Sequence, residues 1–457
     1  MWMNAYTILA YISLLVYLIL GIHLYKRRTK YFIFIFLLYF YQLTAVVSNL
    51  YLEHGNVFIT EQSIYSYGSG STFRLVLYNL AFFLPLSYFL NKMDKVKHLK
   101  ILSLKTKENS AYLTPFFLLL IVFSLLLLYA NLFISGIPLF NDQINRYTFW
   151  ENASKVGFAQ KIHYQISVFG FILGILNSYS KKKKTKVLTV FLLIFSIIYL
   201  ILFGEKFSSI FRTIYMFSIP FFTMKLITKN QFLSSRDYFK ILLAIMLFLV
   251  LIFYNYSGKT ESAFDLFINR AFALQGHTWW GADKYFVNHP DFNNFAQLKN
   301  EVSEITSPTE NHEKTGMRFL MLLISPISLA SQYITNNVNF TMAYPAILLF
   351  SFGKIGTLVF QILMALLTAI VIKTYRDAIV NKRIILGLLS TKIYISLFTL
   401  SYQGDFSDFF NLSTVMIIYI ILFSYLISNV KSIRIKKIKD DNKLHTLHKY
   451  SNYVNKI

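Results

Sequence analysis

Five basic side chains in or beside the polar connections between apolar segments are suited to binding an anion: Arg146, Lys206, Arg212, Arg270 and Arg318. Charges near a membrane plane are costly unless they are paired, so such residues are candidates for a functional site. A guanidinium group matches a phosphate with two parallel hydrogen bonds, which makes a lipid pyrophosphate a suitable ligand. Two simpler roles stay open: the side chains snorkel to the membrane surface, or local acids such as Glu205 neutralise them.

A second group of candidates lies between residues 269 and 285, where aromatic and charged side chains are mixed within one polar stretch. This stretch contains Arg270, Gln275, His277, Trp279, Trp280, Asp283 and Tyr285. Tryptophan at a membrane boundary is usually an anchor, but the Trp279-Trp280 pair lies in the middle of a polar loop. The composition therefore predicts an ordered lid or site rather than a solvated linker.

Several chemistries are excluded or weakened by what the sequence lacks. It has no cysteine, no GxGxxG or Walker motif, and no GxSxG motif, so we expect neither a bound nucleotide nor a thiol or serine nucleophile. His54, His277, His289 and His312 are scattered without metal-ligand spacing. Asp405 and Asp408 form the best remaining acidic pair, which a solvated turn explains equally well. We therefore predict no metal and no cofactor.

The composition indicates a membrane protein. Of 457 residues, 55% are hydrophobic and 14% charged, with a mean hydropathy of +0.50, against roughly 25% charged residues in an average soluble domain. We predict an all-α polytopic protein with a single membrane domain over residues 1–428 and a basic cytoplasmic tail over 429–457. About eleven helices have the apolar length that spanning requires: Ala5–Tyr25, Tyr31–Leu50, Phe73–Leu90, Ala111–Phe133, Ile162–Tyr179, Val187–Phe203, Ile210–Met224, Ile241–Tyr256, Gly356–Ile372, Ile384–Tyr402 and Phe409–Ser428.

The net charge of +24 is distributed unevenly along the chain. Alternate connections hold 31 of the 45 basic residues and only 6 of the 21 acidic ones: residues 26–30, 92–110, 181–186, 225–240, 373–383 and 429–457. The positive-inside rule places these connections in the cytoplasm, with the N-terminus outside and the C-terminus inside. Most of the charge is thereby explained by topology and anionic lipid, and we expect no nucleic-acid partner.

The longest connection, residues 257–342, falls on the outer face between the eighth and ninth predicted spans. A connection of this length is usually functional or disordered. Within it, Met317–Tyr333 is apolar enough to be a further span, but counting it as one would invert every later connection. We expect it to be interfacial or re-entrant. A half-helix over 343–352, interrupted at Gly353-Lys354-Ile355-Gly356, is expected to lead into the ninth span.

Sparse motifs over most of the chain resemble those of the Wzy-type polymerases of O-antigen and oligosaccharide repeat units. They are Gly136-x-Pro138 with Arg146 eight residues later, Gly204-Glu205-Lys206, Arg270-x4-Gln275, and Asn339-Phe340-Thr341 followed by Pro345 and Phe352-Gly353-x-x-Gly356. The sequence departs from the family pattern at Lys206, where arginine is more usual, so the role of this residue is less certain than that of Arg146 or Arg270.

The resemblance implies a GT-C-like, metal-independent glycosyltransferase on the periplasmic face of the bacterial inner membrane. It would transfer a growing glycan from one undecaprenyl pyrophosphate to the next lipid-linked repeat unit, with a chain-length regulator as a further partner. Arg146, Lys206, Arg212, Arg270 and Arg318 would stabilise the departing pyrophosphate. His277 would be the general base, with Asp283 and Glu310 as substitutes. Gln275, Trp279, Trp280 and Tyr285 would contact sugars.

Two other functions stay open. A lipid-linked oligosaccharide flippase would have paired halves and charges lining a central cavity, whereas this chain has one long outer connection and no visible repeat. A different membrane transferase, either an acyltransferase or a metal-dependent GT-C enzyme, is the other alternative. The latter would favour paired acids in the first outer connection, which offers only Glu53 and Glu61.

Overall fold

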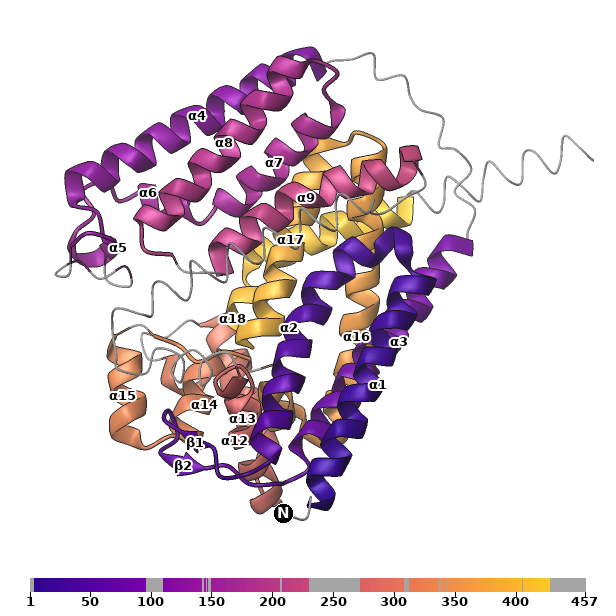
Figure 1. Ribbon diagram of the computed structural model, residues 1–457, viewed down its shortest axis with the longest axis vertical. Helices are drawn as coiled ribbons and strands as arrows, with labels where there is room; N and C mark the ends of the chain where they lie inside the picture. The colour runs from indigo at the N-terminus through magenta and orange to yellow at the C-terminus, as the bar shows by residue number, and fades with distance from the viewer. Residues whose placement is uncertain are drawn as a thin grey trace, which may run out of the picture.

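The computed structural model describes residues 4–95, 110–141, 144, 146, 149–205, 208–229, 272–307, 312–336, 338–342, 344–404 and 406–427. Helices dominate these ranges (Figure 1). Strands β1 (Phe58–Ile59) and β2 (Ile64–Tyr65) pair antiparallel in a short hairpin between two helices. Eight of the described helices are long and apolar enough to cross a membrane, so the chain is an all-α polytopic membrane protein by length and composition.

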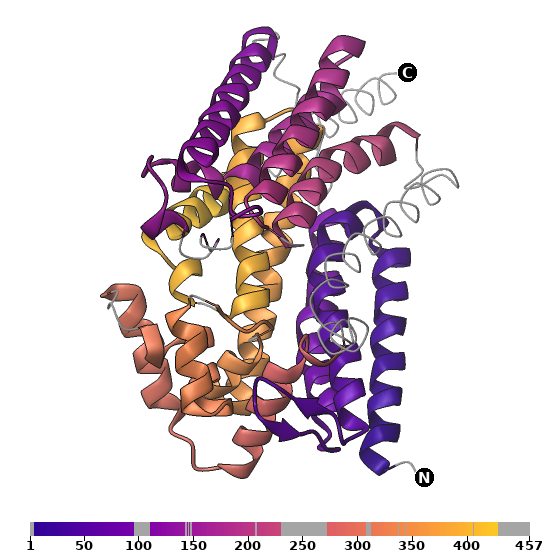
Figure 2. The same ribbon diagram turned by 60° about the vertical axis from the view of Figure 1, so that its left-hand side comes forward.

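The N-terminal helices pack side by side with two helices from the C-terminal part of the chain, as Figures 1 and 2 show. These five are α1 (Ala5–Arg27), α2 (Thr29–Glu53), α3 (Ser71–Lys95), α16 (Ala346–Val380) and α17 (Ile384–Gln403). Short α18 (Phe406–Phe409) and a helix over Leu412–Ile427 follow α17. Most of the buried apolar side chains of α2, α3, α16 and α17 belong to one continuous core.

The middle of the chain forms a second group of helices with its own apolar core. The group comprises α4 (Ser110–Ser135), α5 (Phe149–Asn152), α6 (Ala159–His163), α7 (Ile166–Tyr179), α8 (Lys183–Leu202) and α9 (Ser208–Lys229). Gly170 and Gly174 let α7 approach α9 closely, because a Cβ at either position would lie 2.4 or 2.3 Å from a backbone carbonyl oxygen of α9. α7 also contacts α17, which joins the two groups.

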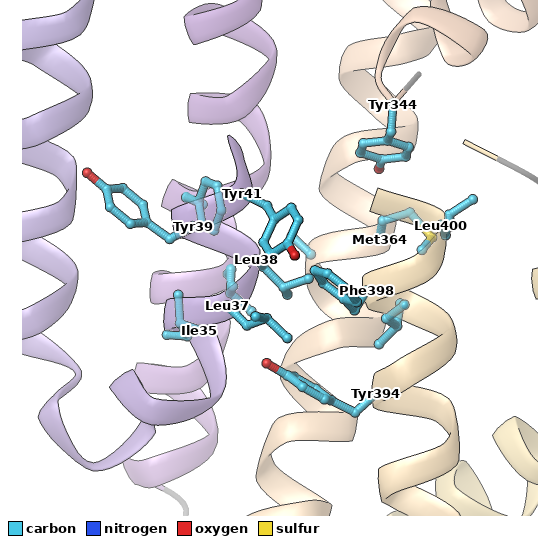
Figure 3. Packing of buried hydrophobic residues seen from close by; sticks show 14 of the residues in the cluster. Ile35, Leu37, Leu38, Tyr39, Tyr41, Tyr344, Met364, Tyr394, Phe398 and Leu400 are labelled. Atoms are coloured by element: carbon cyan, nitrogen blue, oxygen red, sulfur yellow. The ribbon is translucent and has the colours of Figure 1, made fainter. Parts of the chain in front are cut away.

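Aromatic side chains fill much of the first core (Figure 3). Tyr17 on α1 stacks on Tyr39 of α2 at a centroid distance of 4.7 Å, and Tyr39 donates its hydroxyl hydrogen to the Tyr17 carbonyl at 2.9 Å. Tyr41, on the other side of α2, meets Phe398 of α17 edge to face at 4.7 Å. These rings bring large apolar surfaces together, while the tyrosine hydroxyl groups find partners inside the protein.

The predicted outer connection folds into short helices over its described part. These are α12 (His277–Asn288), α13 (Asn294–Thr306), the 3-10 turn η2 (His312–Lys314), α14 (Gly316–Ile324) and α15 (Ile327–Thr335). Ser325 and Pro326 divide the apolar stretch Met317–Tyr333 between α14 and α15. Each of these two helices has nine residues and is about 14 Å long, less than half the thickness of the hydrocarbon core. The stretch is therefore not a straight spanning helix.

The half-helix predicted before the ninth span is present. α16 is two helical segments joined at Gly353, whose φ of 67° and ψ of −176° are far from helical values. The break frees carbonyl groups, and Asn294 at the start of α13 donates its side-chain amide to the carbonyls of Leu349 (3.0 Å) and Phe350 (2.7 Å). Thr357 donates to the Gly353 carbonyl at 2.7 Å. Side chains thus replace the missing backbone partners.

Three of the six basic connections meet at one end of the first group of helices. Lys30 forms an ion pair with Asp94 at 2.6 Å, and Tyr31 donates its hydroxyl hydrogen to the same carboxylate. The Arg376 guanidinium lies 5.4 Å from the centre of the Tyr31 ring. The turn between α1 and α2 therefore shares an end with the C-terminal parts of α3 and α16, as the charge pattern requires. The side of the membrane stays a prediction.

Ten of the eleven predicted spans fall on described helices, and eight of those helices have spanning length. α7 and the helix over Leu412–Ile427 are apolar but shorter. The predicted span Ile241–Tyr256 and the basic tail 429–457 lie outside the described residues. The total of eleven and the orientation of the termini therefore stay predictions.

We predict that Gly353→Ala destabilises the protein by about 1–3 kcal/mol, because the backbone angles of Gly353 are essentially confined to glycine. A Cβ at this position would meet nothing closer than 3.5 Å, so the cost would come from the backbone alone. Thermal unfolding in detergent measures the effect. Gly157→Ala is the matched control, since a Cβ there has no atom within 4 Å; equal melting temperatures for the two variants would contradict the prediction.

Candidate functional site

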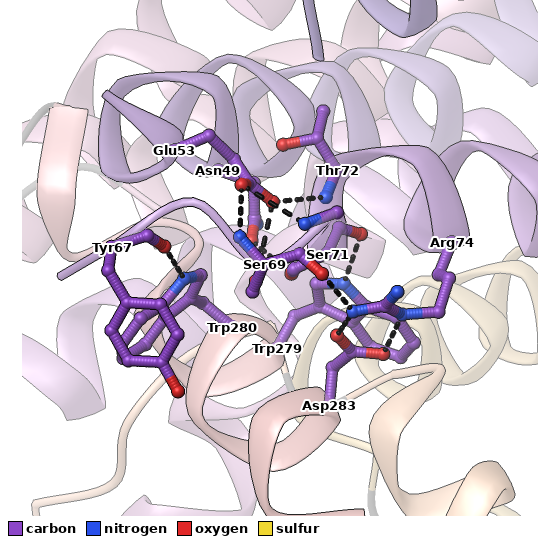
Figure 4. A network of polar contacts seen from close by, with 11 residues as sticks. Asn49, Glu53, Tyr67, Ser69, Ser71, Thr72, Arg74, Trp279, Trp280 and Asp283 are labelled. Carbon is purple, nitrogen blue, oxygen red and sulfur yellow. Dashed lines mark hydrogen bonds and ion pairs between the residues drawn. The ribbon is translucent and has the colours of Figure 1, made fainter. Parts of the chain in front are cut away.

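α12 carries most of the residues predicted in the second group, and it packs between α2, α3 and α16. Trp279 and Trp280 are completely buried. The Trp279 indole N–H donates to the Ser71 carbonyl at 3.0 Å, and that of Trp280 donates to the Tyr67 carbonyl at 3.3 Å. Both rings therefore hold α12 against the start of α3 (Figure 4). Neither offers a face to a sugar in this structure, so we do not carry the predicted sugar contacts of Trp279 and Trp280 forward.

The start of α3 is closed by a carboxylate from the end of α2. Glu53, with 1% of its surface exposed, accepts hydrogen bonds from the backbone N–H groups of Ser69 (2.6 Å), Gly70 (3.1 Å) and Thr72 (3.2 Å). The first N–H groups of a helix have no partner within it, and a negative charge there is favourable. Glu53 therefore fixes the loop that surrounds α12, a role that explains its burial without any catalytic function.

Arg74 and Asp283 form the central ion pair of this assembly (Figure 4). Arg74 on α3 donates Nε to Oδ1 of Asp283 at 2.7 Å and Nη2 to Oδ2 at 2.6 Å, and Nη2 also donates to the Ser69 carbonyl at 2.8 Å. Burial raises the pKa of the Asp283 carboxyl, while the Arg74 guanidinium acts in the opposite direction. Asp283, predicted as a substitute base, is thus the buried partner of an arginine and poorly placed to receive a proton.

His277 lies at the first position of α12 with 2% of its surface exposed. Its Nδ1 is 2.9 Å from the Leu274 carbonyl, and its Nε2 is buried without a partner among the described residues. The ring meets Phe340 edge to face at 4.8 Å. Burial lowers the pKa of the imidazole, against an opposing effect of the Glu61 carboxylate. Burial therefore disfavours the protonated form of the ring, and Nε2 is enclosed.

The other residues predicted near α12 have varied surroundings. Tyr285 is partly buried and stacks on His289 at 4.0 Å, and Gln275 is partly buried and engaged in an interaction. Arg318 on α14 is likewise partly buried and engaged in an interaction. Arg270 and Glu310 lie outside the described residues. The roles given to these residues stay predictions.

A second site forms where two segments that carry the family resemblance meet. Arg146, from the connection that follows Gly136 and Pro138, donates Nη1 to the Gly204 carbonyl at 3.0 Å and lies 3.4 Å from Oε2 of Glu205. Gly204 has a φ of +86°, and a Cβ there would lie 3.8 Å from the Arg146 side chain. Residues almost 60 positions apart are thereby brought into direct contact. Arg146 and Glu205 are each about one-fifth exposed.

Arg212, one helical turn into α9, belongs to the same site. Its Nε donates to Oγ of Ser167 on α7 at 3.0 Å, and it interacts electrostatically with Glu205 and with Tyr41 and Tyr402 of the first group of helices. Ser209 donates its hydroxyl hydrogen to Glu205 at 2.9 Å. Glu205 therefore contacts the Arg146 guanidinium and interacts electrostatically with that of Arg212 at the junction of the two groups of helices. Lys206, another of the predicted cations, lies outside the described residues.

Among the described residues, no three metal-binding side chains come together. Sequence reasoning did not single out Arg74, Gln62 or Ser71, which form the surroundings of α12. Gln62 donates its side-chain amide to the His277 carbonyl at 2.8 Å. One feature of the sequence could have pointed to Arg74. It is the only basic residue in the first half of the third predicted span, and a charge within a span requires a partner.

Residues 310–418 match a protein family of unknown function (DUF6418). The matched stretch contains α14, α15, α16 and α17 with the break at Gly353, but neither α12 nor the Arg146 site. No curated protein and no solved structure matches the chain.

We predict that Arg74→Ala destabilises the protein by about 3 kcal/mol at neutral pH, because it leaves the Asp283 carboxylate buried without its partner. The loss should shrink as the pH falls. Without Arg74 the folded-state pKa of Asp283 rises further above its unfolded value, so the cost is full above the folded pKa and disappears as the pH approaches about 4.

The measurement is the melting temperature of Arg74→Ala and of wild type as a function of pH. His277 is present in both proteins, so the difference isolates the effect on Asp283. Adding Asp283→Asn to the Arg74→Ala variant should recover part of the lost stability and remove the pH dependence of the difference from wild type. A loss that is the same at all pH values would show that the ion pair does not behave as described.

Proposed function

We propose that the chain polymerises undecaprenyl-pyrophosphate-linked oligosaccharide repeat units on the periplasmic face of the bacterial inner membrane. The single observation that carries the proposal is the contact of Arg146 with Gly204 and Glu205 beside Arg212. It joins two of the motifs that resemble Wzy-type polymerases, and it brings together cations that a lipid pyrophosphate would require. A charged group within a membrane domain is a functional candidate when its surroundings hold it in place.

The proposed reaction breaks the bond between the anomeric carbon of the donor glycan and the pyrophosphate oxygen. A hydroxyl oxygen of the acceptor repeat unit forms the new glycosidic bond and loses its proton to a base. Undecaprenyl pyrophosphate leaves with the bonding electron pair, so negative charge grows on its phosphate oxygens. Arg146 and Arg212 are assigned to this charge, since preorganised donors act most strongly where charge develops. Lys206, Arg270 and Arg318 are proposed for the second pyrophosphate.

In this proposal Glu205 is the group that a bound phosphate would displace. Its carboxylate now receives hydrogen bonds from Arg146 and Ser209, which a phosphate group could take over. His277 keeps its proposed role as base because the contact of Nδ1 with the Leu274 carbonyl leaves Nε2 as the atom that can accept a proton. Nε2 is buried, so the acceptor can reach it only if the surroundings of the ring open.

The test is a strain that lacks this gene and is complemented with wild type or single variants, with the surface polysaccharide separated on a gel. The deletion should leave lipid A-core with a single repeat unit, and wild type should restore the ladder. Arg146→Ala and Arg212→Ala should each lower polymerisation about 10²-fold at normal protein levels, by analogy with the loss of one stabilising donor. Lys161→Ala, an exposed cation outside the site, is the matched control.

Bare core in the deletion strain would contradict the proposal, because the block would then precede polymerisation, as expected for a flippase. A normal ladder in both arginine variants would show that polymerisation does not depend on this site. If the Arg212→Lys variant makes a normal ladder, positive charge alone is sufficient at this position. If it loses the ladder as Arg212→Ala does, the two parallel hydrogen bonds of a guanidinium group are required.

We also expect polymerisation by the purified protein, supplied with lipid-linked repeat units, to continue in EDTA. The arginine side chains are proposed to stabilise the leaving group in place of a divalent ion. The measurement is the length of the glycan product with and without chelator, with Mg²⁺ added back as control. Loss of product in EDTA and its return with Mg²⁺ would contradict the metal-free mechanism.

A further inference from the structure

A small cavity lies between α2, α3, α16 and α17, away from the two sites described above. Figure 3 labels four of the residues that line it, Leu38, Tyr344, Met364 and Leu400. None of its lining residues carries a charge, and most are apolar. The exceptions include two glutamines, an asparagine and a threonine, which are expensive residues to bury within a membrane domain.

Four polar atoms on these lining residues are buried without a hydrogen-bond partner in the described part of the chain. They are Oε1 of Gln42, Nδ2 of Asn79, Nε2 of Gln361 and Oγ1 of Thr368. All four side chains are at least 96% buried. They come from three different helices, so their common position at one cavity is not a consequence of neighbouring sequence. Unpaired buried polar groups are rare in folded proteins, so four of them at one cavity indicate a bound partner.

The hydrogen bonds that two of these side chains do make fix the roles of their remaining atoms. Gln42 donates Nε2 to the Ser401 carbonyl at 3.1 Å, which leaves Oε1 as an acceptor. Gln361 accepts from the Tyr344 hydroxyl at 2.9 Å through Oε1, which leaves Nε2 as a donor. With the Asn79 amide and the Thr368 hydroxyl, the cavity offers both donors and acceptors. Its ligand must therefore donate and accept, and it must be neutral.

The size of the cavity selects among neutral ligands. The centre of a water molecule can move within ≈ 20 Å³ of it, and a single water needs about 10–15 Å³ by this measure. The space is too small for a sugar or a lipid head group. We propose that this cavity binds one or two ordered water molecules, which bridge α2, α3 and α16 through Gln42, Asn79, Gln361 and Thr368.

The consequence is a polar connection within the membrane domain that does not depend on direct side-chain contact. Buried water typically makes about three hydrogen bonds and is costly to remove. At this depth a lost bond cannot be replaced by bulk water. The bound water would therefore fix the spacing between the N-terminal helices and the helix that carries the break at Gly353.

The test compares two threonine variants on α16 in lipid nanodiscs. Thr368→Val removes a hydroxyl group that faces the proposed water, with almost no change in volume. Thr374→Val is the matched control, because its hydroxyl is also buried without a partner but does not line the cavity. We expect Thr368→Val to lower the melting temperature by a few degrees and Thr374→Val to leave it unchanged or raise it. If Thr368→Val and Thr374→Val raise the melting temperature equally, the cavity is dry and the proposal is wrong.

Two further measurements make the test independent of a single variant. Asn79→Leu should also lower the melting temperature, and its effect combined with Thr368→Val should be less than additive, because both lose the same water. Full additivity would contradict a shared ligand. Electron cryo-microscopy at a resolution that shows ordered water should reveal compact density within hydrogen-bond distance of Thr368. Elongated density would assign the cavity to lipid or detergent instead, and empty density would overturn the proposal.

Discussion

The structure depends on one constraint: a polar backbone group that is buried away from water must find its partner within the protein. Two places show how this chain meets it. Glu53 satisfies the first N–H groups around α3, and Asn294 satisfies the carbonyls freed where α16 breaks. Asn294 belongs to the large connection, and the loop that Glu53 fixes surrounds α12 of the same connection. The short helices of the large connection are therefore part of the architecture of the membrane domain, and moving them would expose the ends of the long helices.

Composition and spacing predicted the long elements well, because a spanning helix needs only a sufficient apolar length. The break near Gly353 was also predictable, since polar and glycine residues interrupt an apolar run there. The sequence could not indicate which distant side chain would close that break. Asn294 lies more than fifty residues from its partners, and nothing in its neighbours distinguishes it from other asparagines in the same connection. The same limitation applies to Arg74 and Asp283, whose pairing exists only in three dimensions.

The residues of the two candidate sites also differ in how well their roles could be predicted from the sequence. Arg146 and Glu205 belong to short motifs, so they could be singled out before their contact was known. Trp279 and Trp280 also stood out, but for a reason that the structure reverses: their aromatic surface is used for packing, with each indole N–H bound to a backbone carbonyl. A pair of tryptophans in a polar segment predicts an ordered structure more safely than a ligand contact. Burial distinguishes these two uses, and burial cannot be deduced from residue type alone.

The ion pair of Arg74 and Asp283 also bears on how the protein is synthesised. The two residues are 209 positions apart, and at roughly 5–20 residues per second the ribosome needs about 10–40 s to make the intervening chain. During that time α3 is complete, but its arginine lacks the Asp283 carboxylate and has only the nearby Ser69 carbonyl as a partner. The packing of α12 against the start of α3 can therefore form only after residue 283 has been translated.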